Sequence, residues 1–224
     1  MLPVFTQSHG ILMADFLQLL CMAQNSQAIP PQEEGQQVDI VETVKASNEE
    51  EAKLLFLQAR ERLLDINHWS VISEGISASF VLTDEHGKPK QGIPVAGDHF
   101  RIDIPGPGTL LGEGYDWVKV EMIDDNSAAE GKTEWTIIKV RPSEDPAIKK
   151  GVAHFLGEEA TSSFIIRRKN DLILAEVHGR NEKPNTAAGK LPDKIRNTVI
   201  SIGAIAGFAK IQWRKLVKGL LNIR

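Results

Sequence analysis

The sequence contains few residues of the kinds that build catalytic or metal sites. Its 224 residues include one cysteine, Cys21, and six histidines, of which no two stand at H-x-x-x-H spacing. A single cysteine can form neither an intramolecular disulfide nor a cysteine-based zinc site. The net charge of -4 gives no basic field for nucleic acid. We therefore expect no metal, no cofactor and no nucleic-acid partner.

Lysine and arginine are absent from the first 44 residues, and the first cation is Lys45. A secretory signal peptide begins with a positively charged region, so this absence argues against one. We expect residues 11–24 to form an amphipathic helix, followed by a Pro- and Gly-containing linker that ends at residue 37. The expected location is cytoplasmic. The alternative is export, with residues 1–28 as a signal peptide, because "NSQA" at 25–28 has small residues at cleavage-site spacing.

No apolar run is long enough to cross a bilayer. The stretch "NTVISIGAIAGFAKIQWRKLVKGLL" (197–221) is uncharged only over 197–209, whereas a spanning helix needs about 20 apolar residues. Its apolar positions instead form a helical stripe, from Ile195 through Ala206 and Trp213 to Leu220. Gly203 and Gly207 favour close approach of this helix to a sheet or a partner. Its outer middle is also apolar, so we expect residues 11–24 or a second subunit, in a homodimer, to cover it.

Alternating and helical patterns fill the rest of the chain. A strand is predicted at 38–46, and a helix follows from a capping box, Ser47-x-x-Glu50, with Ala52, Leu55, Ala59, Leu63 and Ile66 on one face. Six further strands are predicted at 76–83, 99–105, 115–124, 133–141, 160–168 and 171–180. We therefore divide the chain into an N-terminal helix and linker (1–37) and one α+β domain (38–224).

The order of one strand, a helix, six strands and a long C-terminal helix resembles the START-like (SRPBCC) superfamily, which includes the birch-pollen-allergen proteins and polyketide cyclases. "DINHW" (65–69) resembles the segment in which many members place a tryptophan after their first helices. This resemblance implies a helix-grip fold, in which a curved seven-stranded antiparallel sheet wraps around the last helix. It also implies a cavity for a hydrophobic ligand between the two.

Two acidic residues interrupt the apolar faces of predicted strands. Glu42 is in phase with Val38, Ile40 and Val44, and Asp116 is in phase with Val118, Val120 and Met122. Buried acids are rare unless they are paired or functional, so both are candidates to orient a ligand. The alternative is that each lies at a strand end or bulge and reaches water. The remaining residues expected to line the ligand site are Trp69, Ile102, Val118, Val120, Phe164, Ile202, Ala206, Ala209 and Trp213.

The expected function is binding of a lipid-like, apolar small molecule without catalysis. One alternative is a cyclase- or hydrolase-like enzyme that uses Glu42, Asp116 or His178 as an acid or base. Another is an interaction module that uses the acidic N-terminus and the basic C-terminal helix. His178 and Arg180 are predicted on the outer side of their strand, at a solvated strand end, with anion binding as the other interpretation.

Overall fold

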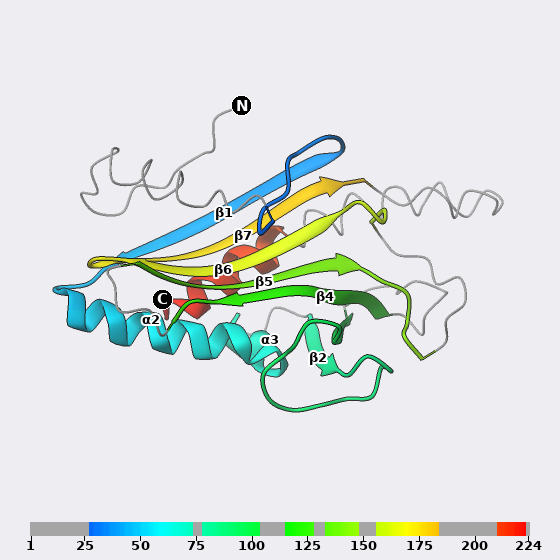
Figure 1. Ribbon diagram of the computed structural model, residues 1–224, viewed down its shortest axis with the longest axis horizontal. Coiled ribbons are helices and arrows are strands. Elements are labelled where there is room, and N and C mark those ends of the chain that lie inside the picture. The colour runs from blue at the N-terminus through cyan, green and yellow to red at the C-terminus, as the bar shows by residue number, and fades with distance from the viewer. Residues whose placement is uncertain are drawn as a thin grey trace.

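The computed structural model describes residues 27–73, 78–103, 115–127, 133–147, 156–183 and 210–222. Seven strands in these ranges form one antiparallel sheet (Figure 1). They are β1 (Gln36–Lys45), β2 (Ser79–Thr83), β3 (His99–Asp103), β4 (Tyr115–Asp125), β5 (Thr133–Pro142), β6 (Thr161–Lys169) and β7 (Leu172–Glu182). Each lies where the alternating sequence pattern predicts a strand, with ends displaced by a few residues.

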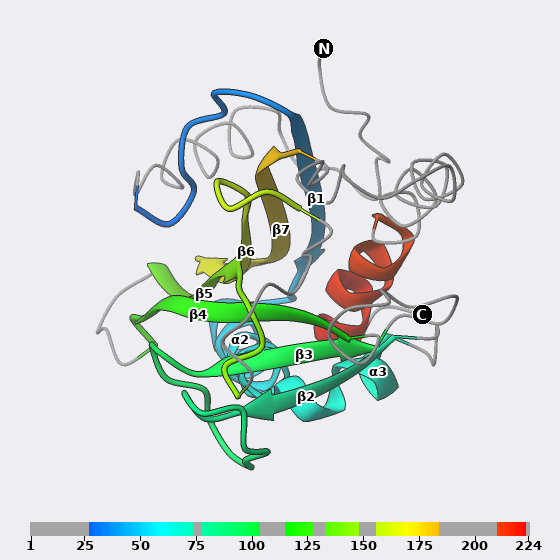
Figure 2. The ribbon, with the colours of Figure 1, turned by 90° about the vertical axis from the view of Figure 1, so that its right-hand side faces the viewer.

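The strand order is β1-β7-β6-β5-β4-β3-β2, so the first two strands of the chain form the two edges of the sheet. Strands β2 to β7 follow one another as a meander, and β1 then pairs with β7. The sheet is strongly curved and open (Figure 2). The helices between β1 and β2 cross the concave side of the sheet. They connect β1 at one edge of the sheet with β2 at the other edge. The predicted α+β class with a curved seven-stranded antiparallel sheet is confirmed.

The first helix after β1 begins one residue later than predicted, because its N-cap is Asn48 and not Ser47. Helix α2 (Glu49–Leu64) has Asn48 as its N-cap, whose side chain accepts a hydrogen bond from the Glu51 N–H. The Glu51 carboxylate accepts in return from the Ser47 N–H, so the reciprocal arrangement is kept at shifted positions. The helix ends at Leu64, and a short 3₁₀ turn, η1 (Ile66–His68), and helix α3 (Trp69–Ile72) follow.

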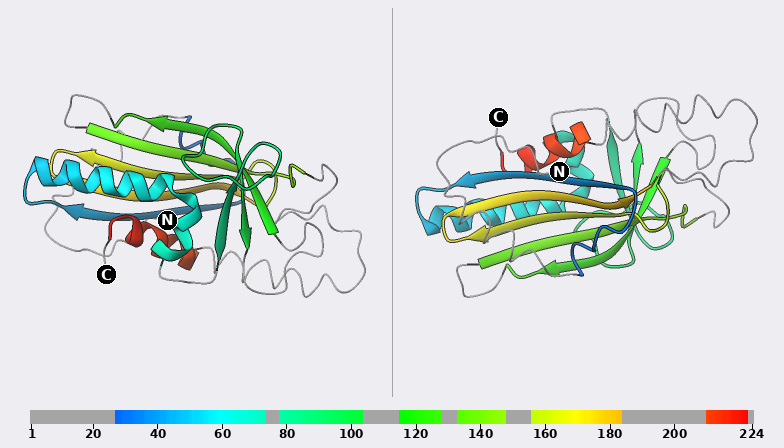
Figure 3. Two further views of the ribbon diagram at one scale, coloured as in Figure 1. Left: turned by 90° about the horizontal axis from the view of Figure 1, so that it is seen from below. Right: turned by 90° about the horizontal axis from the view of Figure 1, so that it is seen from above.

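All helices in the described ranges lie against one face of the sheet, which we call the inner face (Figure 3). It carries Val38, Val118, Phe164 and Val177, which belong to the main hydrophobic core together with the buried side of α2. The buried residues of α2 are Ala52, Phe56, Ala59, Leu63 and Leu64. Burial of the large apolar side chains on this face supplies the main driving force for folding. We call the opposite face the outer face.

The C-terminal helix is described over residues 210–220 and lies on the inner face. The predicted stripe is confirmed here, because Leu216 and Leu220 are buried and Trp213 is half-buried. Gly219 lies so close to α3 that a Cβ atom would overlap the carbonyl oxygen of Ile72. Gln212 also donates a hydrogen bond to the Ser73 hydroxyl, at 2.9 Å. The helix is therefore fixed to α3. Residues 11–24, Gly203 and Gly207 lie outside the described residues.

Residues 27–35, expected as a linker, pack on the outer face and are here called the N-terminal segment. Ala28 is fully buried against Ile137 and Ile165, and its carbonyl oxygen accepts a hydrogen bond from the Ser163 hydroxyl. Lys139 donates to the carbonyl oxygen of Gln27, at 3.0 Å. The segment then reaches the start of β1. The division of the chain at residue 37 stays a prediction, because residues 1–26 lie outside the described ranges.

The described helices include none with the length and hydropathy that a bilayer crossing requires. Nor do the described side chains bring together three or more His, Cys, Asp or Glu groups that could hold a metal ion.

Candidate functional site

An aromatic cluster occupies the space between the inner face and the helices. The ring centroid of Trp69 lies 5.5 Å from that of Phe80, 5.7 Å from that of Phe100 and 4.8 Å from that of Phe164. Trp213 of the C-terminal helix lies 5.1 Å from Phe164 and 6.1 Å from Phe80. Trp69 is fully buried and its indole N–H donates to the carbonyl oxygen of Leu63, at 3.0 Å. The cluster thus joins α3, the sheet and the C-terminal helix.

Several residues expected to line a ligand site come together in this core. Trp69 and Phe164 are in van der Waals range of one another, and Trp213 covers Phe164 from the helix side. Ile102, Val118 and Val120 lie on the inner face of the two adjacent strands β3 and β4. The remaining three, Ile202, Ala206 and Ala209, lie outside the described residues. Whether any of these residues contacts a ligand stays a prediction.

The two acids singled out from the sequence lie at opposite ends of the inner face. Glu42 is half-buried and opposite Ala175 in β7. Following the register across the sheet from Glu42 leads to Ala175, Ile166, Thr136 and finally Asp125, at the far end of β4. Asp116 is near the other end of β4, opposite Ile102. One small ligand therefore cannot contact both carboxylates.

Met122, by contrast, is not in phase with Asp116, Val118 and Val120. The pairing of β4 with β5 shifts between Val120 and Met122, because Glu121 is an extra residue in β4. Such a bulge reverses the facing of the residues that follow it. Met122 consequently packs on the outer face with Ile137 and Ile165, and Ile123 returns to the inner face.

A second bulge brings a further carboxyl group, Glu182, onto the inner face. Val38 is paired with Gly179 and Gln36 with Glu182, so Gln37 alone stands against two residues, Arg180 and Asn181. Asn181 has a φ of 55°, in the left-handed region that asparagine adopts more readily than most residues. Because Gln36 and Val38 share a face, the residue opposite Gln36 shares it too. Strict alternation would have placed Glu182 on the outer face with His178 and Arg180.

Gly179 provides the space for this carboxyl group. A Cβ atom at Gly179 would overlap a carboxyl oxygen of Glu182, and it would lie 3.2 Å from the Cβ of Val38. The Glu182 side chain therefore folds back over the backbone of its own strand, above the glycine. No side chain of this size could approach so closely over any other residue. Within the described ranges, no hydrogen bond or ion pair holds the Glu182 carboxyl group.

Burial raises the pKa of Glu182 to about 7, although the charges of Lys210 and Arg180 oppose the shift. Lys210 is the first described residue of the C-terminal helix. Glu182 thus lies toward the end of the inner face that holds Lys210, which is one turn before Trp213 in the helix. A carboxyl group that titrates near neutral pH beside an apolar wall is typical of ligand-binding and catalytic sites. The sequence signal for it was the local run "HGRNE" (178–182), with a glycine and an asparagine inside a strand.

Comparison with known proteins gives structural likenesses only. No family model and no curated protein matches the chain. Among solved structures, norcoclaurine synthase from Thalictrum flavum has 11% identity and a TM-score of 0.35, covering 97% of this chain and 98% of its own. Major latex-like protein 151 from Panax ginseng has 10% identity and a TM-score of 0.35, covering 76% and 95%. The Zhui aromatase/cyclase from Streptomyces sp. R1128 has 12% identity and a TM-score of 0.35, covering 82% and 96%.

The assignment of the fold rests on the strand order and on the position of the helices. β1 pairs with β7, β2 to β7 form a meander, and the helices lie in the concavity of the curved sheet (Figures 1 and 2). This is a helix-grip fold. In the helix-grip arrangement of this chain, the C-terminal helix, the aromatic cluster and Glu182 share the inner face.

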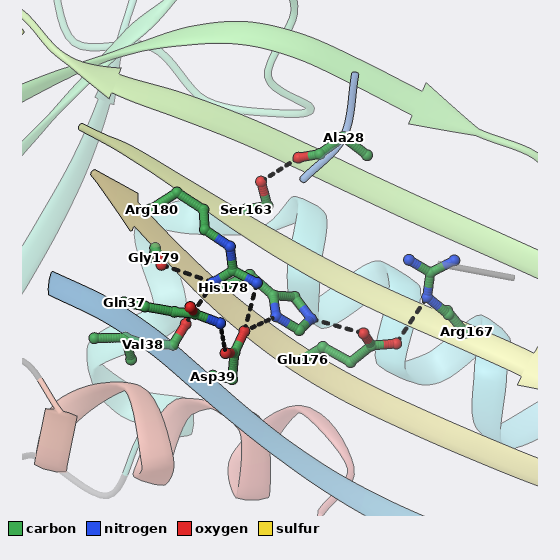
Figure 4. Close-up of polar contacts among 10 residues, drawn as sticks. All are labelled: Ala28, Gln37, Val38, Asp39, Ser163, Arg167, Glu176, His178, Gly179 and Arg180. Carbon is green, nitrogen blue, oxygen red and sulfur yellow. Dashed lines mark hydrogen bonds and ion pairs between the residues drawn. The ribbon is translucent and has the colours of Figure 1, made fainter. Parts of the chain in front are cut away.

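The outer face of the helix-grip sheet carries a buried polar network (Figure 4). His178 lies between two carboxylates, with Nδ1 2.6 Å from Asp39 Oδ1 and Nε2 2.8 Å from Glu176 Oε2. Arg167 donates to Glu176 at 2.7 Å, and Arg180 lies 2.8 Å from Asp39. His178 and Arg180 are thus on the outer face as predicted. The expectation of a solvated strand end was wrong, because both side chains are buried.

The network fixes the charge state of its members. Burial would lower the pKa of His178, but hydrogen bonds and charges from Asp39 and Glu176 raise it above the ordinary value. Burial would likewise raise the pKa values of Asp39 and Glu176, but their hydrogen bonds hold both below the ordinary range. Each of these acids is paired on the outer face, whereas the Glu182 carboxyl group on the inner face has no hydrogen bond or ion pair with another described residue. We therefore take Glu182, and not the paired network, as the candidate functional group.

Proposed function

We propose that this protein binds a largely apolar small molecule between the inner face of the sheet and the C-terminal helix, with the polar end of the ligand at Glu182. The observation that carries the proposal is the Glu182 carboxyl group, which has no hydrogen-bond partner among the described residues and a pKa of about 7, on the face that carries the hydrophobic core. Pockets that bind small molecules are lined mainly by apolar and aromatic groups, with few polar groups that set orientation. Trp213 and Phe164, whose ring centroids lie 5.1 Å apart, would supply aromatic contacts on this face.

The protonation state of Glu182 determines which polar group it accepts. The protonated carboxyl group donates a hydrogen bond to a carbonyl, hydroxyl or anionic oxygen, whereas the carboxylate repels an anion. At neutral pH both forms are present, since the pKa is about 7. A ligand with an anionic end should therefore bind more tightly at pH 6 than at pH 8. A neutral ligand should show little change over this range.

The test uses two fluorescent probes of similar apolar body and different charge. The anionic probe is 8-anilinonaphthalene-1-sulfonate and the neutral probe is N-phenyl-1-naphthylamine. We expect the affinity for the anionic probe to fall about tenfold between pH 6 and pH 8, because a charge develops beside the sulfonate. Glu182→Gln should remove this pH dependence. Glu42→Gln is the matched control, because Glu42 lies on the same face at the opposite end.

Either of two results would contradict the proposal. One is that neither probe binds and no small molecule accompanies the protein in native mass spectrometry. The other is that Glu42→Gln, and not Glu182→Gln, removes the pH dependence. This result would place the polar end of the ligand at Glu42. The homodimer and the cytoplasmic location also stay proposals, the first to be checked by light scattering.

A second candidate function is acid–base catalysis by Glu182. A general acid or base works best when its pKa is close to the working pH, and about 7 meets this condition. Chemical conversion of a bound ligand, lost in Glu182→Gln while binding is kept, would distinguish an enzyme from a binding protein.

A further inference from the structure

Asn181 joins the two faces of the sheet. Its positive φ forms the bulge that turns Glu182 onto the inner face. Its side chain lies on the N-terminal segment of the outer face, where Oδ1 accepts hydrogen bonds from the N–H groups of Glu33, at 2.8 Å, and Glu34, at 3.2 Å. The side-chain amide donates to the carbonyl oxygen of Pro31, at 3.3 Å. One residue therefore contacts the segment and sets the direction of Glu182.

The backbone of the bulge is held by the same segment. The Asn181 N–H donates to the side-chain oxygen of Gln32, at 3.0 Å. This oxygen replaces the acceptor that β1 would supply in a regular strand ladder. Gly35 has a φ of 73°, and a Cβ atom there would lie 2.7 Å from the carbonyl oxygen of Glu182. The backbone of the segment thus runs directly against the backbone of Glu182. An ion pair between Lys183 and Glu34 closes the contact on the other side.

The bulge has no other support of comparable extent in the described residues. A non-glycine residue at positive φ is unfavourable unless its surroundings hold it there. Four hydrogen bonds from residues 31–34 provide that support. If they are lost, the regular pairing of β7 with β1 becomes the competing arrangement, and it turns Glu182 to the outer face.

We propose that Asn181 is a positioning residue that couples the docking of residues 31–35 on the outer face to the position of the Glu182 carboxyl group, and hence to ligand affinity on the inner face. The statement on affinity rests on the proposed function, whereas the statement on position does not. Docking of the segment and binding of the ligand then favour each other reciprocally. Among the described residues, the charges that lower the pKa of Glu182 are those of Lys210 and Arg180, and neither residue belongs to the segment.

The experiment compares Gln32→Ala and Asn181→Ala with Gln37→Ala. Gln37 is the matched control, because its side chain bonds to Asp39 and not to Asn181. The titration of Glu182 is followed by carbon NMR of the carboxyl group in the unliganded full chain. We expect its midpoint to fall from about 7 toward the ordinary value near 4.5 in Asn181→Ala, by at least one pH unit in Gln32→Ala, and not at all in Gln37→Ala. Gln32→Ala leaves the sequence of β7 unchanged. It therefore tests the coupling between the segment and Glu182 even if Asn181→Ala does not fold.

Hydrogen exchange gives a second readout. The amide groups of Glu33 and Glu34 should exchange faster in both test variants and more slowly when N-phenyl-1-naphthylamine is bound. If exchange of these amides accelerates while the Glu182 midpoint stays near 7, the coupling does not exist. If the midpoint shifts as expected but no probe binds to any variant, the coupling stands and the proposed function fails.

Discussion

Replacement of Glu182 by glutamine should stabilise the protein at high pH. The pKa of Glu182 is about 7 in the folded protein and 4.5 for an ordinary glutamate, a difference of about 2.5 pH units. Each unit corresponds to about 1.4 kcal/mol, which gives an upper value of about 3.5 kcal/mol. Because the side chain keeps some contact with water, we expect about 2 kcal/mol.

The sign follows from proton binding. The folded state holds the proton of Glu182 more tightly than the unfolded state between pH 4.5 and about 7. The stability contributed by this group is therefore complete below pH 4.5, declines as the pH rises to about 7, and stays at its lower level above. Glutamine is uncharged at every pH and escapes this decline. The two proteins should be close in stability at pH 4.5 and differ most above pH 7.

The assay is urea denaturation of the wild type, Glu182→Gln and Glu42→Gln at pH 5 and pH 8.5. Other titrating groups, including the outer-face network, cancel in the difference between wild type and variant. The Glu182→Gln difference should grow by about 2 kcal/mol between the two pH values, and the Glu42→Gln difference should not. Parallel stability curves for the wild type and Glu182→Gln would show that the carboxyl group is solvated, and would refute the placement of Glu182.

Three further predictions concern other contacts. Gly179→Ala should keep the fold but displace the flexible Glu182 side chain, and the NMR midpoint of Glu182 should fall by about one pH unit or more. Gly219→Ala should lower the free energy of unfolding by about 2 kcal/mol, because the added methyl group meets backbone of α3; Gly157→Ala, with its nearest atom 3.8 Å away, should not change it. The pKa of His178 is raised from 6.5, so its stabilising effect is complete below pH 6.5 and is lost as the pH rises through the higher folded value. Denaturation should therefore show His178→Gln costing more at pH 6 than at pH 9.

Periodicity in the sequence was sufficient to predict the elements and most of their faces. Alternation in β1 and β3 to β7 and the stripe Trp213–Leu216–Leu220 depend on which side chains are apolar, and burial follows that pattern directly. The prediction of faces from periodicity failed where one extra residue enters a strand. Met122 was assigned to the inner face, and Glu182 received no role, because a bulge is a property of the pairing and not of one strand alone.

The candidate site was predicted less well for a second reason. Glu42 and Asp116 were chosen because acids are out of place on apolar faces, which is a valid criterion for a single strand. It gives no information on how far apart two such acids lie, since this depends on the register of the strands between them. The burial of His178 was missed because the buried network includes Asp39, from a distant part of the chain, as well as Glu176, two residues earlier in the same strand.

The close contact between Gly219 and Ile72 has a mechanical consequence. Together with the hydrogen bonds from Gln212 to Ser73 and from Arg62 to the carbonyl oxygen of Leu220, it joins residues 210–220 to α2 and α3 as one rigid layer. A swing of this helix away from α3 would break all three contacts at once. A change in the distance between this layer and the aromatic residues of the sheet would then require bending of the seven-stranded sheet, in which β1 and β2 form opposite edges. We therefore expect the sheet, and not the helical layer, to deform when the distance between the two changes.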